Sequence, residues 1–277
     1  MTPSVAMRSE LELIRPLAWA GVLVPPANPT IEPELHRLVT PAMTLFAARF
    51  PTMPGTTLEQ RNRRYIALYR DAVRSFGELR LAAIVIGLTG PSYRLGCKGD
   101  LALTEELTAH ADGIPVETAS RAIALALTEI GARRLCLVSP YPLWLTQEAV
   151  TYWREGGYDI VQVVKIAETS RAYDLTNDDV TAALATVKHD AIDATIMSGT
   201  GMLTLPAILT ARESGVATPI LSSNLCCAWW LLRTAAQARG SASFERAAPE
   251  LAAHLRSSIH APKALERIHR EPDDPSP

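Results

Sequence analysis

Short runs of consecutive apolar residues alternate along this chain with longer segments in which apolar and polar residues recur at helical spacing. Runs that are apolar at consecutive positions are typical of parallel strands covered by helices on both faces. We place one of these runs, residues 43–50, at a sheet edge. The predicted strands are residues 18–25, 43–50, 82–90, 114–119, 134–140, 160–167, 194–201 and 219–224.

The amphipathic segments between these strands predict helices. Ser120 is a candidate cap for one of them, which ends near Gly131, and residues 177–179 place Asn and Asp at another helix start. Repeated strand–helix units predict right-handed crossovers and a doubly wound α/β architecture. The predicted helices are residues 58–79, 120–132, 143–157, 177–189, 205–215 and 225–240, with a further candidate at 247–268.

The composition indicates a soluble α/β protein. The 277 residues are 48% hydrophobic, which can bury one large core or two smaller ones. A net charge of −2 gives no basic excess for nucleic acid or an anionic membrane surface. No apolar stretch reaches the roughly 20 residues of a membrane helix. The acids Glu10 and Glu12 near the start argue against a secretory signal, so we expect a cytoplasmic protein.

The cysteines are too few and too irregular for a disulfide scaffold or a metal site, and we expect reduced thiols. They are Cys97, Cys136, Cys226 and Cys227. The sequence contains neither GxGxxG nor GxxxxGK[ST], and the prolines of residues 25–29 lack the N–H donors on which such loops depend. The histidines fall outside the loops where chemistry is expected.

Ligands of parallel α/β sheets bind beyond the carboxyl ends of the strands. The loops at these ends carry hydroxyls, amides and glycines but few charges, which suits a small anion held by neutral donors at helix N-termini. Ordinary strand–helix turns remain the alternative for any single loop. The loops are residues 25–30, 88–94, 139–144, 198–203 and 222–224.

Several segments in this order resemble the aspartate/glutamate racemase superfamily, in its maleate cis-trans isomerase and arylmalonate decarboxylase branch. They are VPPANPTIEPEL, GLTGPSYRLG, GARRLCLVSPYPLWLTQEAVTYWREGGYDIV, SGTGMLTLPAI and PILSSNLCCAWWLLR. The resemblance implies two similar Rossmann-like domains with an interdomain cleft, residues 1–118 plus 222–277 and residues 119–221. It also implies action on a small carboxylate without a metal or an organic cofactor, and a possible homodimer.

The resemblance also implies roles for single residues. Three hydroxyl residues would be catalytic around an oxyanion hole: Thr89, Tyr141 and Thr200. The substrate would be bound by Pro26, Asn28, Gly90, Ser198, Gly199, Gly201 and Asn224. In this interpretation, the prolines after the first strand determine the direction in which the chain leaves that strand, and Asn28 therefore points into the cleft.

The sequence departs from the family where the two catalytic cysteines are expected. Leu88 and Gly199 occupy those positions, and neither side chain can act as an acid or a nucleophile. The two-cysteine racemisation and the cysteine-addition isomerisation should therefore be impossible. Cys97, Cys226 and Cys227 are substitutes only if they reach the cleft.

These observations leave three functions open. The first is an enzyme with lyase, decarboxylase or isomerase chemistry in an oxyanion pocket. The second is hydrolysis of an amide or cyclic imide, with Glu32, Glu117 or Glu168 as the base. The third is an inactive protein that binds a small carboxylate.

Overall fold

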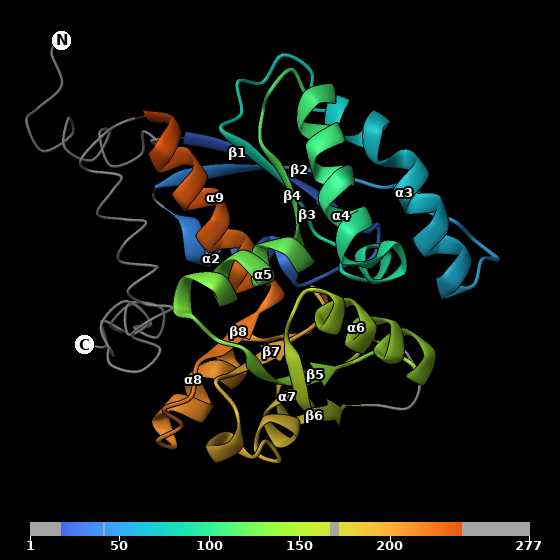
Figure 1. The fold of residues 1–277 in the computed structure, drawn as a ribbon. Coiled ribbons are helices and arrows are strands. Elements are labelled where there is room, and N and C mark those ends of the chain that lie inside the picture. The colour runs from blue at the N-terminus through green and yellow to red at the C-terminus, as the bar shows by residue number, and fades with distance from the viewer. Residues whose placement is uncertain (1–17, 41, 167–171, 240–277) are drawn as a thin grey trace, which may run out of the picture.

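The structure is a computed structural model that describes residues 18–40, 42–166 and 172–239. It contains two parallel four-stranded sheets (Figure 1). The first sheet has the order β2-β1-β3-β4 and the second the order β6-β5-β7-β8, so the same strand order occurs twice along the chain. The strands are β1 (Ala18–Val24), β2 (Met43–Arg49), β3 (Ala83–Ile86), β4 (Val116–Thr118), β5 (Arg134–Ser139), β6 (Asp159–Lys165), β7 (Ala194–Met197) and β8 (Ile220–Ser222).

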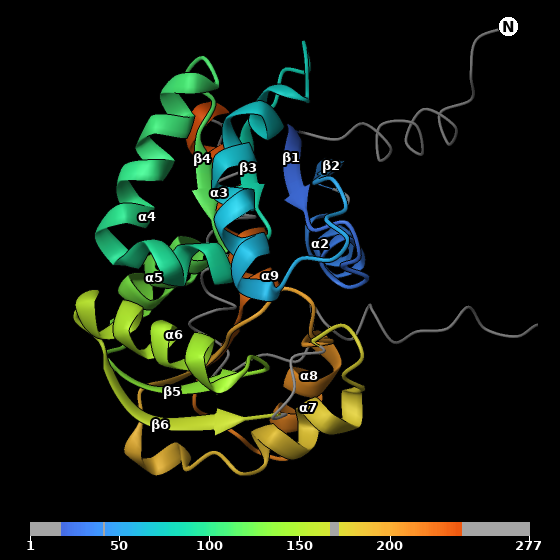
Figure 2. The same cartoon turned by 90° about the vertical axis from the view of Figure 1, so that its right-hand side faces the viewer.

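Helices cover both faces of each sheet (Figures 1 and 2). In the first sheet, one face packs on α3 and α4, and the other packs on α2, α5 and α9. In the second sheet, α7 and α8 lie on one face and α6 on the other. The helices are α2 (Ile31–Val39), α3 (Leu58–Arg74), α4 (Gly90–His110), α5 (Ala119–Ile130), α6 (Leu143–Glu155), α7 (Asn177–Leu184), α8 (Leu205–Glu213) and α9 (Ser223–Arg239), with a 3₁₀ turn at His189–Ala191.

The apolar runs are strands because both of their faces are buried. Along β1, Val22 and Val24 contribute to the core shared with α2 and α9, whereas Leu23 contributes to the core under α3. Gly21 lies against the ring of Phe76, where an added Cβ would come within 2.8 Å of two ring atoms. The predicted α/β fold and the edge position of residues 43–50 are confirmed.

The two halves share one apolar core. A single cluster contains Ala20 and Val85 from the first sheet and Leu137 and Ile196 from the second. Helices α5 and α9 pack on each other within this cluster, and Trp229 of α9 is 1% exposed there. Strands β1 to β4 fall in the range predicted for the first domain, and β5 to β7 fall in the range predicted for the second.

Several helix predictions differ from the structure. Helices α2 and α4 are absent from the predicted set; Gly96, with φ +73°, kinks α4, and the hydrophobic face of α4 is weak. The cap of α5 is Thr118, whose hydroxyl accepts the N–H of Arg121 at 3.2 Å, and Ser120 lies inside the helix. Helix α7 ends at Leu184, before the 3₁₀ turn. The candidate helix at 247–268 lies outside the described residues.

Within the ranges that the structure describes, no helix is both long enough and apolar enough to cross a membrane.

Candidate active site

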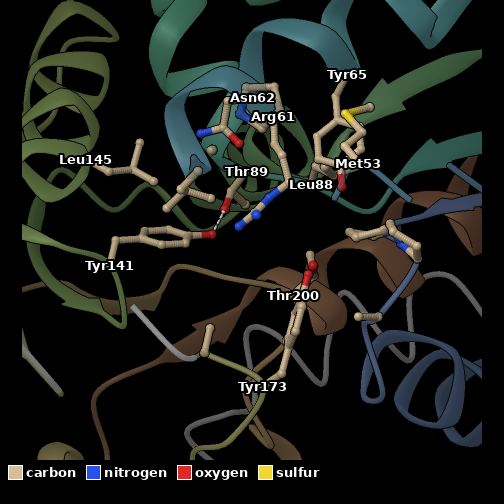
Figure 3. Close-up of a pocket in the computed structure, with 18 of the residues that line it drawn as sticks. Met53, Arg61, Asn62, Tyr65, Leu88, Thr89, Tyr141, Leu145, Tyr173 and Thr200 are labelled. Carbon is tan, nitrogen blue, oxygen red and sulfur yellow. Dashed lines mark hydrogen bonds between the residues drawn. The ribbon is translucent and has the colours of Figure 1, made fainter. Parts of the chain in front are cut away.

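A cavity of about 570 Å³ lies between the two sheets, at the carboxyl ends of their strands (Figure 3). This volume is within the range of about 300–1,000 Å³ that is usual for small-molecule sites. Loops that follow β1, β2, β3, β5, β6 and β7 all contribute to its wall. Among the lining residues are Pro25, Pro26, Thr52, Met53, Arg61, Asn62, Tyr65, Leu88, Thr89, Gly90, Tyr141, Leu145, Tyr173, Asp174, Thr200 and Gly201.

Thr89 and Tyr141 come from loops of different sheets, and their hydroxyl groups meet in the wall of this cavity (Figure 3). Their hydroxyl oxygens are 2.5 Å apart, and either one can be the donor. Because one proton is used in this bond, the pair retains one hydroxyl proton for a ligand. Burial raises the pKa of Tyr141 above its ordinary value, so the phenol stays protonated at neutral pH.

The N-terminus of α4 lines the cavity next to the Thr89–Tyr141 pair. Thr89 is the cap residue, but its side chain makes no capping bond and is directed to Tyr141 instead. Helix α4 begins at Gly90, with Pro91 in its first turn, and no side chain caps the N–H groups there. Free N–H groups at the positive end of a helix favour an anion.

Asn28 connects the two halves behind the cavity wall. Its Oδ1 accepts the backbone N–H of Thr30 at 2.9 Å and that of Ile31 at 3.2 Å, at the start of α2. Its Nδ2 donates to the Thr200 hydroxyl at 2.9 Å, and Thr200 in turn donates to the Gly87 carbonyl at 2.8 Å. The hydroxyl proton of Thr200 is therefore already used, so this hydroxyl can only accept a further hydrogen bond.

The remaining predicted binding residues divide into two groups. Pro26, Gly90 and Gly201 line the cavity. Ser198, Gly199 and Asn224 are not among its lining residues, and each forms hydrogen bonds within the protein, although the Asn224 Oδ1 has no partner among the described residues. Ser198 bonds with the Tyr93 hydroxyl, the Gly199 N–H donates to Ser223, and the Asn224 amide donates to Glu34 and to the Thr200 carbonyl.

Glu34 joins α2 to the second half of the molecule. Its sequence pattern alone does not identify it as a buried residue. The carboxylate is 4% exposed and accepts the backbone N–H groups of Thr204 and Leu205 at 2.6 and 2.9 Å. It also accepts the Thr204 hydroxyl at 2.8 Å and the Asn224 amide at 2.7 Å. Burial raises the pKa of Glu34, and these donors oppose the rise. Glu34 thus caps α8 from the other half of the molecule.

None of the cysteines lines the described cavity. Leu88 does line it, at one of the two positions where the resemblance places a thiol. At the other, Gly199 has φ +124°, and a Cβ there would approach Pro140 within 3.0 Å. Cys226 and Cys227 are fully buried, and burial raises the pKa of both thiols. Cys97 is half-buried, and burial raises its pKa too.

Two of the three glutamates considered as hydrolytic bases, Glu32 and Glu117, are not among the residues that line the cavity. Glu32 forms an ion pair with Arg49 on the surface. Glu117 is 6% exposed and forms an ion pair with Arg121, with 2.9 Å between Nε and Oε1. Glu168 lies outside the described residues. No described glutamate lines the cavity, and Asp174 is the carboxylate among its lining residues.

Glu117 predicts a pH dependence of stability. Burial raises its pKa from 4.5 to about 7, although Arg121 opposes the rise. Between these two values the folded chain holds a proton that the unfolded chain has released, so the free energy of unfolding falls as the pH rises from about 4.5 to 7. The loss is about 3 kcal/mol. Urea unfolding at pH 5 and pH 7.5 measures it.

The Glu117→Gln variant is the control for this loss, because the amide does not titrate. We expect the stability of the variant to change less than that of the wild type between the two pH values. Equal changes in both proteins would show that another group is responsible.

Two further residues of the cavity wall come from α3. Arg61 and Asn62 lie in its first turns, next to the loop that follows β2. Sequence reasoning missed both, because arginines on an amphipathic helix are typical of a solvated face. The signal that could have revealed them is their position just after a loop at the carboxyl end of a strand.

The fold and the cavity together define a two-sheet α/β protein with a small-molecule site between its halves, whose wall contains neutral donors, a helix N-terminus and the charged side chains of Arg61 and Asp174. Residues 20–247 match the family model described as arylmalonate decarboxylase. This match covers most of the chain, and the protein belongs to that family.

Known relatives agree with this assignment. The maleate isomerase of Nocardia farcinica is 25% identical over 228 residues, which is 77% of this chain and 88% of the relative. That of Alcaligenes faecalis is 22% identical, over 77% of this chain and 89% of the relative. The relatives are isomerases and decarboxylases, so the family to which the chain belongs is one of lyase and isomerase enzymes.

Solved structures show the same fold. The maleate isomerase from Pseudomonas putida S16 has a TM-score of 0.71 at 21% identity, covering 78% of this chain and 92% of that one. Unliganded arylmalonate decarboxylase has a TM-score of 0.65 at 22% identity, covering 79% and 92%. A cysteine variant of the Nocardia farcinica isomerase carries a covalently bound succinylcysteine intermediate, with a TM-score of 0.71 at 20% identity over 78% and 92%.

Proposed function

We propose that this protein is a cofactor-independent enzyme that removes a carboxyl group from a small substituted malonate, through an oxyanion pocket instead of through cysteines. The observation that carries this proposal is the Thr89–Tyr141 hydroxyl pair at the uncapped N-terminus of α4. Both hydroxyls face a cavity that no described thiol lines. Family membership supports chemistry at a carbon next to a carboxylate.

The residues allow a specific course for the reaction. The carboxylate that remains on the substrate is held by the Gly90 N–H and by the free hydroxyl proton of the Thr89–Tyr141 pair. When the other carboxylate leaves as CO₂, the electrons of the broken C–C bond form an enediolate on the retained group. Donors already directed at its oxygens stabilise this developing charge.

The wall of the cavity favours departure of the second carboxylate. Leu88 and Leu145 line the cavity beside the donors, and neither offers a hydrogen bond. A carboxylate held against apolar side chains lacks the solvation it has in water, whereas neutral CO₂ does not need that solvation. The carbanion then takes a proton from water or from the hydroxyl pair, which water reprotonates.

The experiment is proton NMR in D₂O with purified protein. The probes are maleate and a panel of aryl- and alkyl-substituted malonates, including 2-methyl-2-phenylmalonate and its 4-carboxyphenyl analogue. We expect at least one malonate to lose CO₂ and to gain one deuterium at the α carbon, and we expect maleate to remain unchanged.

Two results would overturn this proposal. Conversion of maleate to fumarate without loss of CO₂ would make the protein an isomerase. Binding of the monoacid products in calorimetry without turnover of any probe would make it a binding protein. The Thr89→Val variant, purified in the same way, controls for contaminating activity.

A further inference from the structure

Arg61 places a positive charge in the cavity wall, apart from the neutral donors. Its side chain extends into the space that Tyr141 and Thr200 also face (Figure 3). Its Nη1 donates to the Thr56 carbonyl at 3.0 Å, and this is the one hydrogen bond that the described residues give to the guanidinium. A guanidinium has five N–H donors, so most of its donors remain for a ligand.

Three nearby arginines differ from Arg61, because each has a carboxylate partner, whereas Arg64 on the same helix is exposed. Arg63 pairs with Glu59, and Arg70 pairs with Glu106. Arg94 pairs with both Glu59 and Glu148. Among the described residues, no carboxylate pairs with Arg61. Asp174, a carboxylate that also lines this cavity, has an interaction of its own within the protein.

Two phenols lie near the Arg61 guanidinium. Burial raises the pKa of Tyr65, and burial raises that of Tyr173 to about 12, whereas the charge of Arg61 acts in the opposite direction on both. Met53 and Leu58 line the cavity as well, and both are apolar. Arg61 is thus the cation of a largely apolar part of the wall.

Asn62 adds a buried donor to this part of the cavity wall. It is 3% exposed, and its Nδ2 has no hydrogen-bond partner within the described part of the chain. Its amide lies against Gly90, where an added Cβ would come within 2.8 Å of Nδ2. A buried donor without a partner is costly, and a bound ligand oxygen would remove that cost.

We infer that Arg61 is a specificity residue that binds a further anionic group of the substrate, in addition to the two malonate carboxylates, carried at the far end of the substituent on the reacting carbon. This inference rests on the proposed function. The substrate would then have its retained carboxylate at Thr89, Tyr141 and Gly90 and its leaving carboxylate beside Leu88 and Leu145. An apolar segment would follow beside Met53 and Leu58, and a distal carboxylate or similar anion would lie at Arg61. A charge-assisted bond to a planar guanidinium favours such a group.

Calorimetry tests this inference without any need for turnover. The probes are phenylacetate and 4-carboxyphenylacetate, which differ by one distal carboxylate. We expect the wild type to bind the diacid about 10- to 100-fold more tightly, as charged hydrogen bonds allow. Arg61→Met should abolish this preference, and Arg61→Lys should retain part of it. Arg63→Met is the matched control on the same helix and should keep the wild-type ratio.

Three results would overturn the inference. They are equal affinities in the wild type, a wild-type ratio in Arg61→Met, and an equal loss of the ratio in Arg63→Met. Thermal unfolding of each variant shows that it is folded. If no malonate is turned over but the diacid preference depends on Arg61, the proposed reaction fails and the anion site stands. If malonates are turned over without that preference, the anion site alone fails.

Discussion

Replacing Tyr141 with phenylalanine is expected to lower kcat by about 10²–10³-fold on the malonate that the wild type decarboxylates. This is the usual effect of losing one oxyanion donor. The hydroxyl of Tyr141 forms a 2.5 Å bond with Thr89 at the uncapped start of α4. Thr89→Val removes the other hydroxyl at nearly constant shape, and the same loss is expected. Steady-state kinetics on each variant measures both effects.

The double variant makes this prediction sharper. The hydroxyl that remains in either single variant keeps a proton but loses the partner that orients it, whereas the double variant has no hydroxyl proton left. Losing both should therefore cost more than losing either one, but less than the sum of the two single losses. Tyr158→Phe is the matched control, since the Tyr158 hydroxyl donates to the Ala124 carbonyl at 3.0 Å, away from the cavity. Wild-type kcat in Tyr141→Phe and in Thr89→Val would refute the assigned role.

Replacing Glu34 with alanine is expected to lower the free energy of unfolding by about 3–5 kcal/mol. The change leaves the N–H groups of Thr204 and Leu205, the Thr204 hydroxyl and the Asn224 amide without their buried acceptor. It also leaves a cavity between α2 and α8. Urea unfolding measures the loss.

Glu32→Ala is the control, on the same helix. Glu32 pairs with Arg49 at the surface, where such pairs contribute about 0–1 kcal/mol. Glu34→Gln should lie between the two alanine variants, because the amide keeps one acceptor oxygen and loses the other. A loss below about 1 kcal/mol in Glu34→Ala would mean that water satisfies the exposed donors equally well.

Local patterns predict the strands well, because consecutive apolar residues report burial on both faces. The run at 134–140 corresponds to β5 (Arg134–Ser139), and the run at 43–50 corresponds to the edge strand β2. Helix α4 escapes this reasoning. Its first turns hold Pro91 and Gly96 and face the site, so its apolar residues do not recur on one stripe.

The site residues can be predicted from the sequence only where they lie in loops at the ends of strands. Strand-end loops identify Thr89 and Tyr141 as candidates, because the topology places such loops at one edge. Arg61 and Glu34 lie inside helices, where a charged residue is usually solvated. Only the tertiary structure shows that one of them faces a cavity and that the other is buried among donors from a distant segment.

The hydrogen bonds behind the site have a consequence for how a substrate is received. Asn28 to Thr200, Thr30 to Gly201 and Glu34 to Thr204 all cross between segments more than 165 residues apart. These hydrogen bonds oppose a hinge motion that would open and close the cavity between the two halves. The site is preorganised: a ligand enters through the mouth of the cavity and finds the donors already in place, so little of its binding energy is spent on closing the protein.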